Sequence, residues 1–157
     1  MGDIDMNDIL ILASAKSTRV SLAGVRIGRY ELSERRKKLL SRVPNSGNYV
    51  RLKRNALELM DLAFLSAKTG DEFAILRGKH EDILFHGTPR WCCFCGVLEK
   101  EIKNHRYELV GHSHPGEDEP EPSFEDRLFL REIGQKCSAV ISARTGMTVL
   151  YTESPFE

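Results

Sequence analysis

Residues 107–134 of this chain read YELVGHSHPGEDEPEPSFEDRLFLREIG and contain the signals of a strand, a loop and a helix. We predict a strand over Tyr107–His114. Pro115 ends it, because proline has no N–H to donate to a sheet ladder. Ser123 follows Pro122 and is a favoured N-cap residue, so a helix is predicted to begin there and to end near Gly134.

Two histidines and an aspartate in this stretch are candidate metal ligands. Alternate residues of a strand share a face, so His112 and His114 present both imidazoles on one side of the strand's end. Asp126 lies at the third helical position and shares a helix face with the apolar residues Phe129, Leu130 and Ile133. An unpaired carboxylate facing the protein interior is costly, and a metal ion removes that cost. Two imidazoles, one carboxylate and an open position are typical of catalytic zinc.

Each half of this pattern also has an interpretation without a metal. A histidine pair on a strand is weak evidence by itself. Ser123 and Asp126 have the spacing of a capping box, in which the acid reaches back to the N-cap amide. The combination of two histidines, a proline-bearing loop and P-S-x-x-D at a helix start is much more specific than either half.

The flanking sequence predicts further helices and strands. Leu52–Ala67 has helical periodicity, and Gly70 stands where a C-terminal glycine belongs. Five further strands are predicted: Glu72–Arg77, Ile83–His86, Trp91–Leu98, and the hairpin pair Cys137–Ala143 and Met147–Thr152. The order indicates the α/β class, with one mixed β-sheet flanked by helices.

Residues 1–49 are treated as a basic N-terminal extension of a domain that covers residues 50–157, either as a separate module or as part of that domain. Short strands are predicted at Ile9–Leu12 and Val20–Ile27. Ser33 is predicted to cap a basic helix that continues to about Val43, and Pro44–Asn48 reads as a loop.

The chain has 157 residues, of which 41% are hydrophobic and 29% charged, as in one ordinary globular domain. Its 23 basic and 23 acidic residues cancel, so net charge favours no class of partner. The basic run at residues 35–38 has few aromatic neighbours, which does not favour nucleic acid. The apolar run Ile9–Ala13 is too short for a signal peptide or a membrane span, so a soluble cytoplasmic protein is expected.

Three of the four cysteines, Cys92, Cys93 and Cys95, crowd into one apolar run. Adjacent residues of a strand point to opposite faces, and zinc sites usually take paired Cys-x-x-Cys ligands. We therefore interpret this run as a buried strand lined with thiols rather than as a second metal site.

The stretch Gly111–Asp126 resembles the JAMM motif of the JAB/MPN metallopeptidases, which reads H-[ST]-H-P and, after a short loop, S-x-x-D. It is also similar to the RadC-like branch, H-N-H-P-S-G…P-S-x-x-D. The resemblance covers roughly residues 50–152. The loop Pro115–Pro122 is one residue longer than usual, and the glycines expected after the upstream glutamate are shifted or missing.

This resemblance implies an α-β-α arrangement like that of cytidine deaminases, and a role for each matching residue. His112, His114 and Asp126 would bind one zinc ion per chain. Ser123 would help to hold the tetrahedral intermediate, and Glu72 would be the general base. Glu108 is the rival base that strand alternation places on the histidine face, but at four residues' distance it lies about 13 Å away.

The expected function is zinc-dependent hydrolysis of peptide or isopeptide bonds, with a peptide or a ubiquitin-like protein as substrate. The alternatives are a non-catalytic scaffold with the MPN fold, a RadC-like DNA-associated protein, and an effector, toxin or phage-encoded processing protein. The intact ligand set favours the enzyme over the scaffold. The sequence indicates no oligomeric state.

Overall fold

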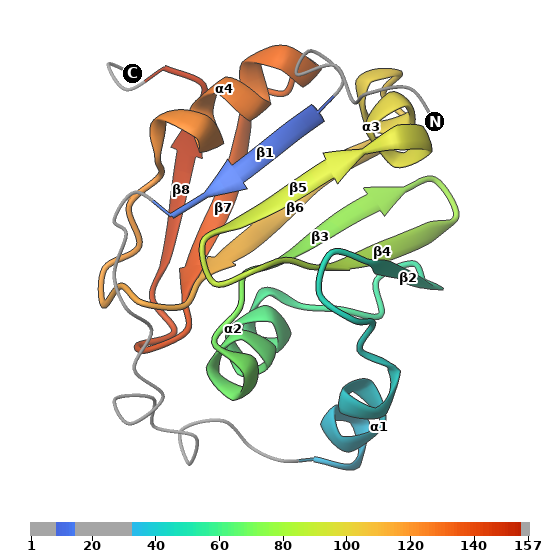
Figure 1. The fold of residues 1–157 in the computed structure, drawn as a ribbon, viewed down its shortest axis with the longest axis vertical. Helices are drawn as coiled ribbons and strands as arrows, with labels where there is room; N and C mark the ends of the chain where they lie inside the picture. The colour runs from blue at the N-terminus through green and yellow to red at the C-terminus, as the bar shows by residue number, and fades with distance from the viewer. Residues whose placement is uncertain (1–8, 15–32, 155–157) are drawn as a thin grey trace.

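The computed structural model describes residues 9–14 and 33–154, which form one large sheet, one two-stranded sheet and four helices (Figure 1). The large sheet has the order β2-β4-β3-β6-β7-β8, and only its β6–β7 pairing is parallel. The smaller sheet pairs β1 antiparallel with β5. The prediction of a mixed α/β fold is confirmed. The elements are β1 (Ile9–Ala13), α1 (Glu34–Arg42), β2 (Tyr49–Lys53), α2 (Leu59–Thr69), β3 (Phe73–Gly78), β4 (Glu81–His86), β5 (Trp91–Cys95), α3 (Gly96–Lys103), β6 (Tyr107–His114), α4 (Phe124–Ile133), β7 (Cys137–Ser142) and β8 (Thr148–Thr152).

Strand β3 separates two apolar clusters, because successive side chains alternate between the faces of the sheet. Phe73 and Ile75 lie in a cluster with the buried residues of α2, and α1 joins this cluster through Leu39. Ala74 and Leu76 lie in the other cluster, with buried residues of β1, β5, α3 and α4. The large sheet is therefore covered on both faces.

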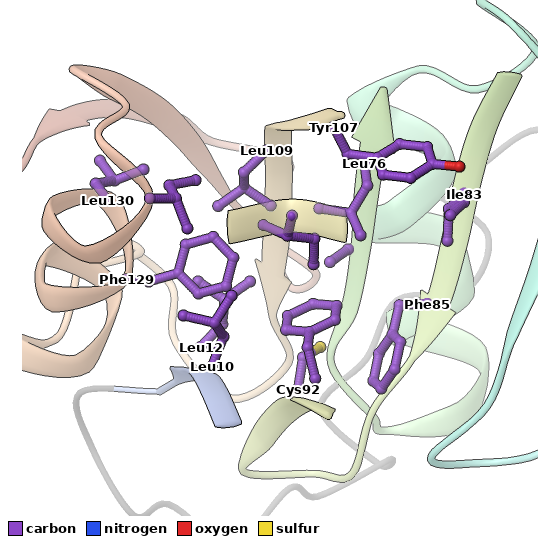
Figure 2. Packing of buried hydrophobic residues seen from close by; sticks show 14 of the residues in the cluster. Leu10, Leu12, Leu76, Ile83, Phe85, Cys92, Tyr107, Leu109, Phe129 and Leu130 are labelled. Carbon is purple, nitrogen blue, oxygen red and sulfur yellow. The ribbon is translucent and has the colours of Figure 1, made fainter. Parts of the chain in front are cut away.

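The N-terminal strand β1 belongs to this second cluster. Leu10 and Leu12 are buried, and Figure 2 shows them beside Phe129 of α4. The strand predicted at Ile9–Leu12 is confirmed and extends to Ala13. The strand predicted at Val20–Ile27 lies outside the described residues.

Two predicted elements were wrong in extent. Tyr49–Lys53 is a strand, and the helix that follows begins at Leu59 rather than at Leu52. Asn55 has a positive φ of 65°, which no continuous helix can accommodate. The strand predicted at Trp91–Leu98 ends at Cys95, because Gly96 turns the chain (φ 68°) into the unpredicted helix α3.

The four predicted helix caps agree with the structure. Ser33 and Ser123 are the N-caps of α1 and α4, and each accepts a backbone N–H from its own first turn. Gly70 and Gly134 are left-handed C-caps. Within the described ranges, none of the helices combines the length and the apolar character needed to span a bilayer.

Candidate metal centre

A β-bulge near the middle of β6 sets the direction of the two histidines. Leu109 pairs with Leu76 and Gly111 with Ile75, so Val110 is an extra residue in the ladder. The bulge shifts the alternation by one residue, which places His112 and His114 on the same face as Leu109, toward α4. Without it, strand alternation would turn both imidazoles toward α2.

The bulge also corrects the expectation for Glu108. Simple alternation placed Glu108 on the histidine face, but it precedes the bulge and lies on the opposite face, where it is exposed and pairs with Arg77 across the ladder. It is therefore excluded as a base for the histidine site by orientation as well as by distance.

Helix α4 brings Asp126 to the histidines. Its Oδ2 accepts the N–H of Ser123 at 3.0 Å, which completes the capping box with the Ser123 side chain. Its Oδ1 accepts the N–H of Ala13 at 2.9 Å. Oδ2 also lies 3.1 Å from His112 Nε2 and 3.2 Å from His114 Nε2. Asp126 thus has both roles considered from the sequence, in the capping box and beside the histidines.

Tetrahedral zinc ligands have a spacing close to that of three atoms here: Asp126 Oδ2, His112 Nε2 and His114 Nε2. The two Nε2 atoms are 3.2 Å apart, so the three atoms form a nearly equilateral triangle. Ligands placed 2.0–2.1 Å from zinc at tetrahedral angles are separated by about 3.3 to 3.4 Å. All three residues are fully buried. The donor set and its spacing therefore fit zinc.

The same contacts change the protonation of the ligands. Burial disfavours the charged form of His114, but the hydrogen bonds to Asp126 and Glu117, together with the nearby charges of Asp126 and Glu72, outweigh burial and raise its pKa to about 10. Burial opposes ionisation of Asp126 too, yet the charge of His112 and the hydrogen bonds from both histidines lower the pKa of this carboxyl well below its usual range. The pocket thus stabilises a carboxylate beside positive charge.

Glu72 joins this group from the neighbouring strand. Ala74 pairs with His112, so Glu72, two residues earlier, lies across from His114. Ligand atoms of Glu72, His112 and His114 all lie within 4.8 Å of one another. Glu72 directly precedes β3 and is fully buried, and burial raises its pKa well above the ordinary value. A carboxylate with a raised pKa at this position can accept a proton readily.

Ser123 contributes a hydroxyl beside the ligand Asp126. It is almost fully buried, and its Oγ accepts the N–H of Asp126 at 3.1 Å. A serine hydroxyl that accepts one hydrogen bond still carries a proton to donate. Ser123 is therefore hydrogen-bonded to Asp126, the residue of α4 that contacts both histidines of β6.

Glu117 was not among the candidate site residues predicted from the sequence. Its Oε2 lies 2.8 Å from His114 Nδ1 and accepts the backbone N–H of Glu121 at 3.1 Å. A carboxylate behind a ligating histidine fixes the ring's tautomer and orientation. Its position three residues after His114, in the loop that ends the strand, was the available signal. Among the described residues, Nδ1 of His112 has no hydrogen-bond partner.

The cysteine run lies beside the site without forming a site of its own. Only Cys92 is buried, whereas Cys93 is half-buried and Cys95 exposed, so the predicted thiol-lined buried strand holds for one residue of three. Burial raises the pKa of Cys92 well above its ordinary value. Within residues 9–14 and 33–154, the group whose potential ligand atoms lie within 4.8 Å of one another consists of Glu72, His112 and His114 and contains no cysteine.

Comparisons with protein-family models, with curated proteins and with solved structures find no match to this chain. The interpretation of the site therefore depends on its geometry and on the motif.

Proposed function

We propose that this chain is a zinc-dependent hydrolase of peptide or isopeptide bonds, of the JAMM type. The observation that carries the proposal is the convergence of His112, His114 and Asp126 on one point, with Glu72 on the adjacent strand. Two imidazoles and a carboxylate leave a fourth position open, as catalytic zinc requires. The covering of the sheet by helices on both faces agrees with the arrangement expected for JAB/MPN domains.

His112, His114 and Asp126 would hold the zinc, and Glu117 would orient His114. A bound zinc ion supplies Lewis acidity, which acidifies water and polarises the scissile carbonyl. Glu72 takes a proton from the attacking water and passes it to the leaving nitrogen. A C–O bond forms, the C–N bond breaks, and the products are a carboxylic acid and an amine. The Ser123 hydroxyl donates a hydrogen bond to the carbonyl oxygen as negative charge develops there.

The substrate class follows from the motif rather than from a shaped pocket. An ordinary peptide and the tail of a ubiquitin-like protein offer the same amide chemistry to such a site. The acidic loop that follows His114 contains Glu117, Asp118, Glu119 and Glu121, and it favours substrates with a basic segment near the cleaved bond.

The proposal is tested first by metal content and hydrolysis together. The purified protein should hold about one zinc per chain, and His114→Ala should lose it. Cleavage is measured with quenched fluorescent peptides, some with an ordinary amide and others with a lysine isopeptide bond. Stoichiometric zinc that survives His112→Ala combined with His114→Ala would place the metal elsewhere.

Glu72→Gln separates an enzyme from a non-catalytic metal protein. The amide cannot accept the proton, so hydrolysis should fall by about 10²- to 10⁴-fold while zinc and fold are kept. Glu108→Gln is the matched control, since Glu108 lies on the opposite face of the sheet, and its turnover should equal that of the wild type. An active Glu72→Gln beside an inactive Glu108→Gln would refute the assignment of the base.

A further inference from the structure

The end of the N-terminal strand touches both carboxylates of the candidate site. The backbone N–H of Ala13 donates to Asp126 Oδ1 at 2.9 Å. The hydroxyl of Ser14 donates to Glu72 Oε2 at 3.0 Å. Asp126 is the candidate zinc ligand and Glu72 the candidate base. Two consecutive residues, outside the stretch that resembles the JAMM motif, therefore reach two groups of different function.

The N–H of Ala13 is available because of its place in the β1–β5 ladder. In an antiparallel pair, successive N–H groups point alternately toward the partner strand and away from it. Ser14 N donates across the pair to Arg90 O at 3.0 Å, so the N–H of Ala13 points away from β5. The bond to Asp126 uses this free donor and costs the sheet no hydrogen bond.

Strand β1 and Ser14 are fixed by contacts on both sides of the segment. Leu10 and Leu12 are buried beside Phe129, as Figure 2 shows, which ties β1 to the helix that carries Asp126. Ser14 also forms a β-bridge with Pro122, directly before the N-cap of α4. The donors of Ala13 and Ser14 are therefore fixed in place before a substrate binds, which is what a preorganised site requires.

The carboxylate of Glu72 has one oxygen engaged and one open. Ser14 occupies Oε2, whereas Oε1 is buried and has no hydrogen-bond partner among the described residues. A single donor on one oxygen fixes the rotation of the carboxylate and leaves the other oxygen for the proton that the reaction moves. Without the Ser14 hydroxyl, the Glu72 carboxylate can rotate, and neither of its oxygens is held in a fixed position.

We infer that Ala13 and Ser14 are positioning residues of the active centre: the Ala13 N–H orients Asp126 for zinc, and the Ser14 hydroxyl orients Glu72 for proton transfer. The Ser14 half rests on the proposed hydrolytic function. The Ala13 half concerns metal affinity alone and stands without it. The N-terminal strand is then part of the catalytic machinery, and residues 50–152 alone form an incomplete site.

Ser14 is tested by separating turnover from substrate binding. Ser14→Ala should lower kcat about 10- to 100-fold, with KM and zinc content unchanged, because it misorients the base without removing it. Ser14→Thr keeps the hydroxyl and should restore most of the lost kcat. Ser138→Ala is the control: it deletes a buried hydroxyl that donates to Leu109 O, and its kcat should be that of the wild type.

Ala13 is tested by zinc affinity, measured by competition with a chromogenic chelator. Ala13→Pro removes the N–H that the ladder does not use, and zinc should bind about 10- to 100-fold more weakly. Ala13→Gly keeps the N–H and should bind zinc as the wild type does. Thermal unfolding of the metal-free variants shows whether each one folds. If Ala13→Pro does not fold, the Ser14 series still decides the half of the inference that concerns Glu72.

The outcomes separate the two claims. A wild type that hydrolyses its substrates, with Ser14→Ala and Ala13→Pro indistinguishable from it, overturns the inference and leaves the proposed function intact. Ser14→Thr that is as slow as Ser14→Ala overturns the role of the hydroxyl. A wild type that binds zinc and cleaves none of the peptides refutes the proposed function, while the chelator measurement still decides the role of Ala13.

Discussion

Two fully buried aspartates occupy the same position in their helices, Asp61 in α2 and Asp126 in α4. Each accepts the N–H of its N-cap residue, at 2.8 Å from Glu58 and 3.0 Å from Ser123. They differ in what neutralises them. The guanidinium of Arg35 donates to both carboxylate oxygens of Asp61, at 2.8 Å to Oδ1 and 2.6 Å to Oδ2. Asp126 instead contacts two histidines.

The same capping box can therefore face either a permanent ion pair or a group of potential metal ligands. A guanidinium is permanently charged and cannot bind a metal, so the Arg35–Asp61 pair fixes α1 on α2 and nothing more. An imidazole is neutral or charged according to its surroundings and is a common metal ligand. The identity of the partner, rather than the capping box, separates the candidate metal centre from the pair that joins two helices.

The largest effect is expected when the carboxylate charge of each aspartate is removed in turn. Asp126→Asn should abolish stoichiometric zinc binding and hydrolysis, because the site loses an anionic ligand. Asp61→Asn should leave both unchanged, since Asp61 lies in the other apolar layer. Zinc is measured by elemental analysis after gel filtration. Full zinc occupancy in Asp126→Asn would show that the two aspartates do not differ in the way we describe.

The N-caps of α4 and α1, Ser123 and Ser33, should differ in the same way as the two aspartates. Ser123→Ala and Ser33→Ala each remove an N-cap and should each cost about 1 kcal/mol of stability, measured by urea unfolding. Only Ser123→Ala should also lower turnover, by about 10²-fold or more, through loss of the oxyanion donor. Ser123→Asn restores the cap without the hydroxyl. Full activity in Ser123→Asn would refute the catalytic role.

Glu117 tests whether the metal region has its own supporting carboxylate. Glu117→Gln removes the charge behind His114 and should weaken zinc binding by about 10- to 100-fold, as chelator competition would measure. Glu119→Gln, two residues along the same loop and exposed, should not change the affinity. Equal affinities for both variants would mean that Glu117 only shapes the loop.

Asp61 should have the least influence on the candidate metal centre, because its charge acts on acid stability instead. Burial opposes ionisation of Asp61, but the hydrogen bonds from Arg35 and the Glu58 N–H, together with the charges of Arg35 and Arg36, outweigh it and lower the pKa below the ordinary value. A lowered folded pKa contributes stability that is complete above the unfolded pKa, about 3.9, and is lost as pH falls through the folded value. Asp61→Asn should therefore cost about 1–3 kcal/mol at pH 7, and the difference from the wild type should shrink below about pH 4.

Urea unfolding at several pH values provides this measurement. Glu34→Gln serves as control, because the Glu34–Lys37 pair is exposed and should leave the unfolding midpoint unchanged. A difference between Asp61→Asn and the wild type that persists unchanged at pH 2 would mean that packing, rather than charge, accounts for the loss.

The parts of this fold that local chemistry specifies could be predicted from the sequence. The helix caps depend on the backbone and side-chain preferences of single residues. Two helices begin after Ser33 and Ser123, two end at Gly70 and Gly134, and all four caps are placed as expected. The error at Tyr49–Lys53 arose because apolar spacing there also fits a helix. Only its pairing with β4, a long-range contact, makes it a strand.

The arrangement of the candidate residues could be predicted in part. His112, His114 and Asp126 were found by alternation and helix phase, and Ser123 by its capping role. Glu72 was assigned through the resemblance alone. The bulge at Val110, which orients both histidines, comes from a pairing that alternation does not reveal. The role of the Ala13 N–H cannot be read from the residue type, because every residue except proline has a backbone N–H.

The pairing of β1 with β5 has a consequence for biosynthesis. Leu12 meets Cys92, roughly 80 residues later in the chain, so at typical rates of synthesis β1 leaves the ribosome roughly 4–16 s before its partner strand. During that interval the apolar segment ILILA has no strand to pair with and is a site for chaperone binding or aggregation. Asp126 emerges later still, so the contact between Ala13 and Asp126 forms only after α4 has been made.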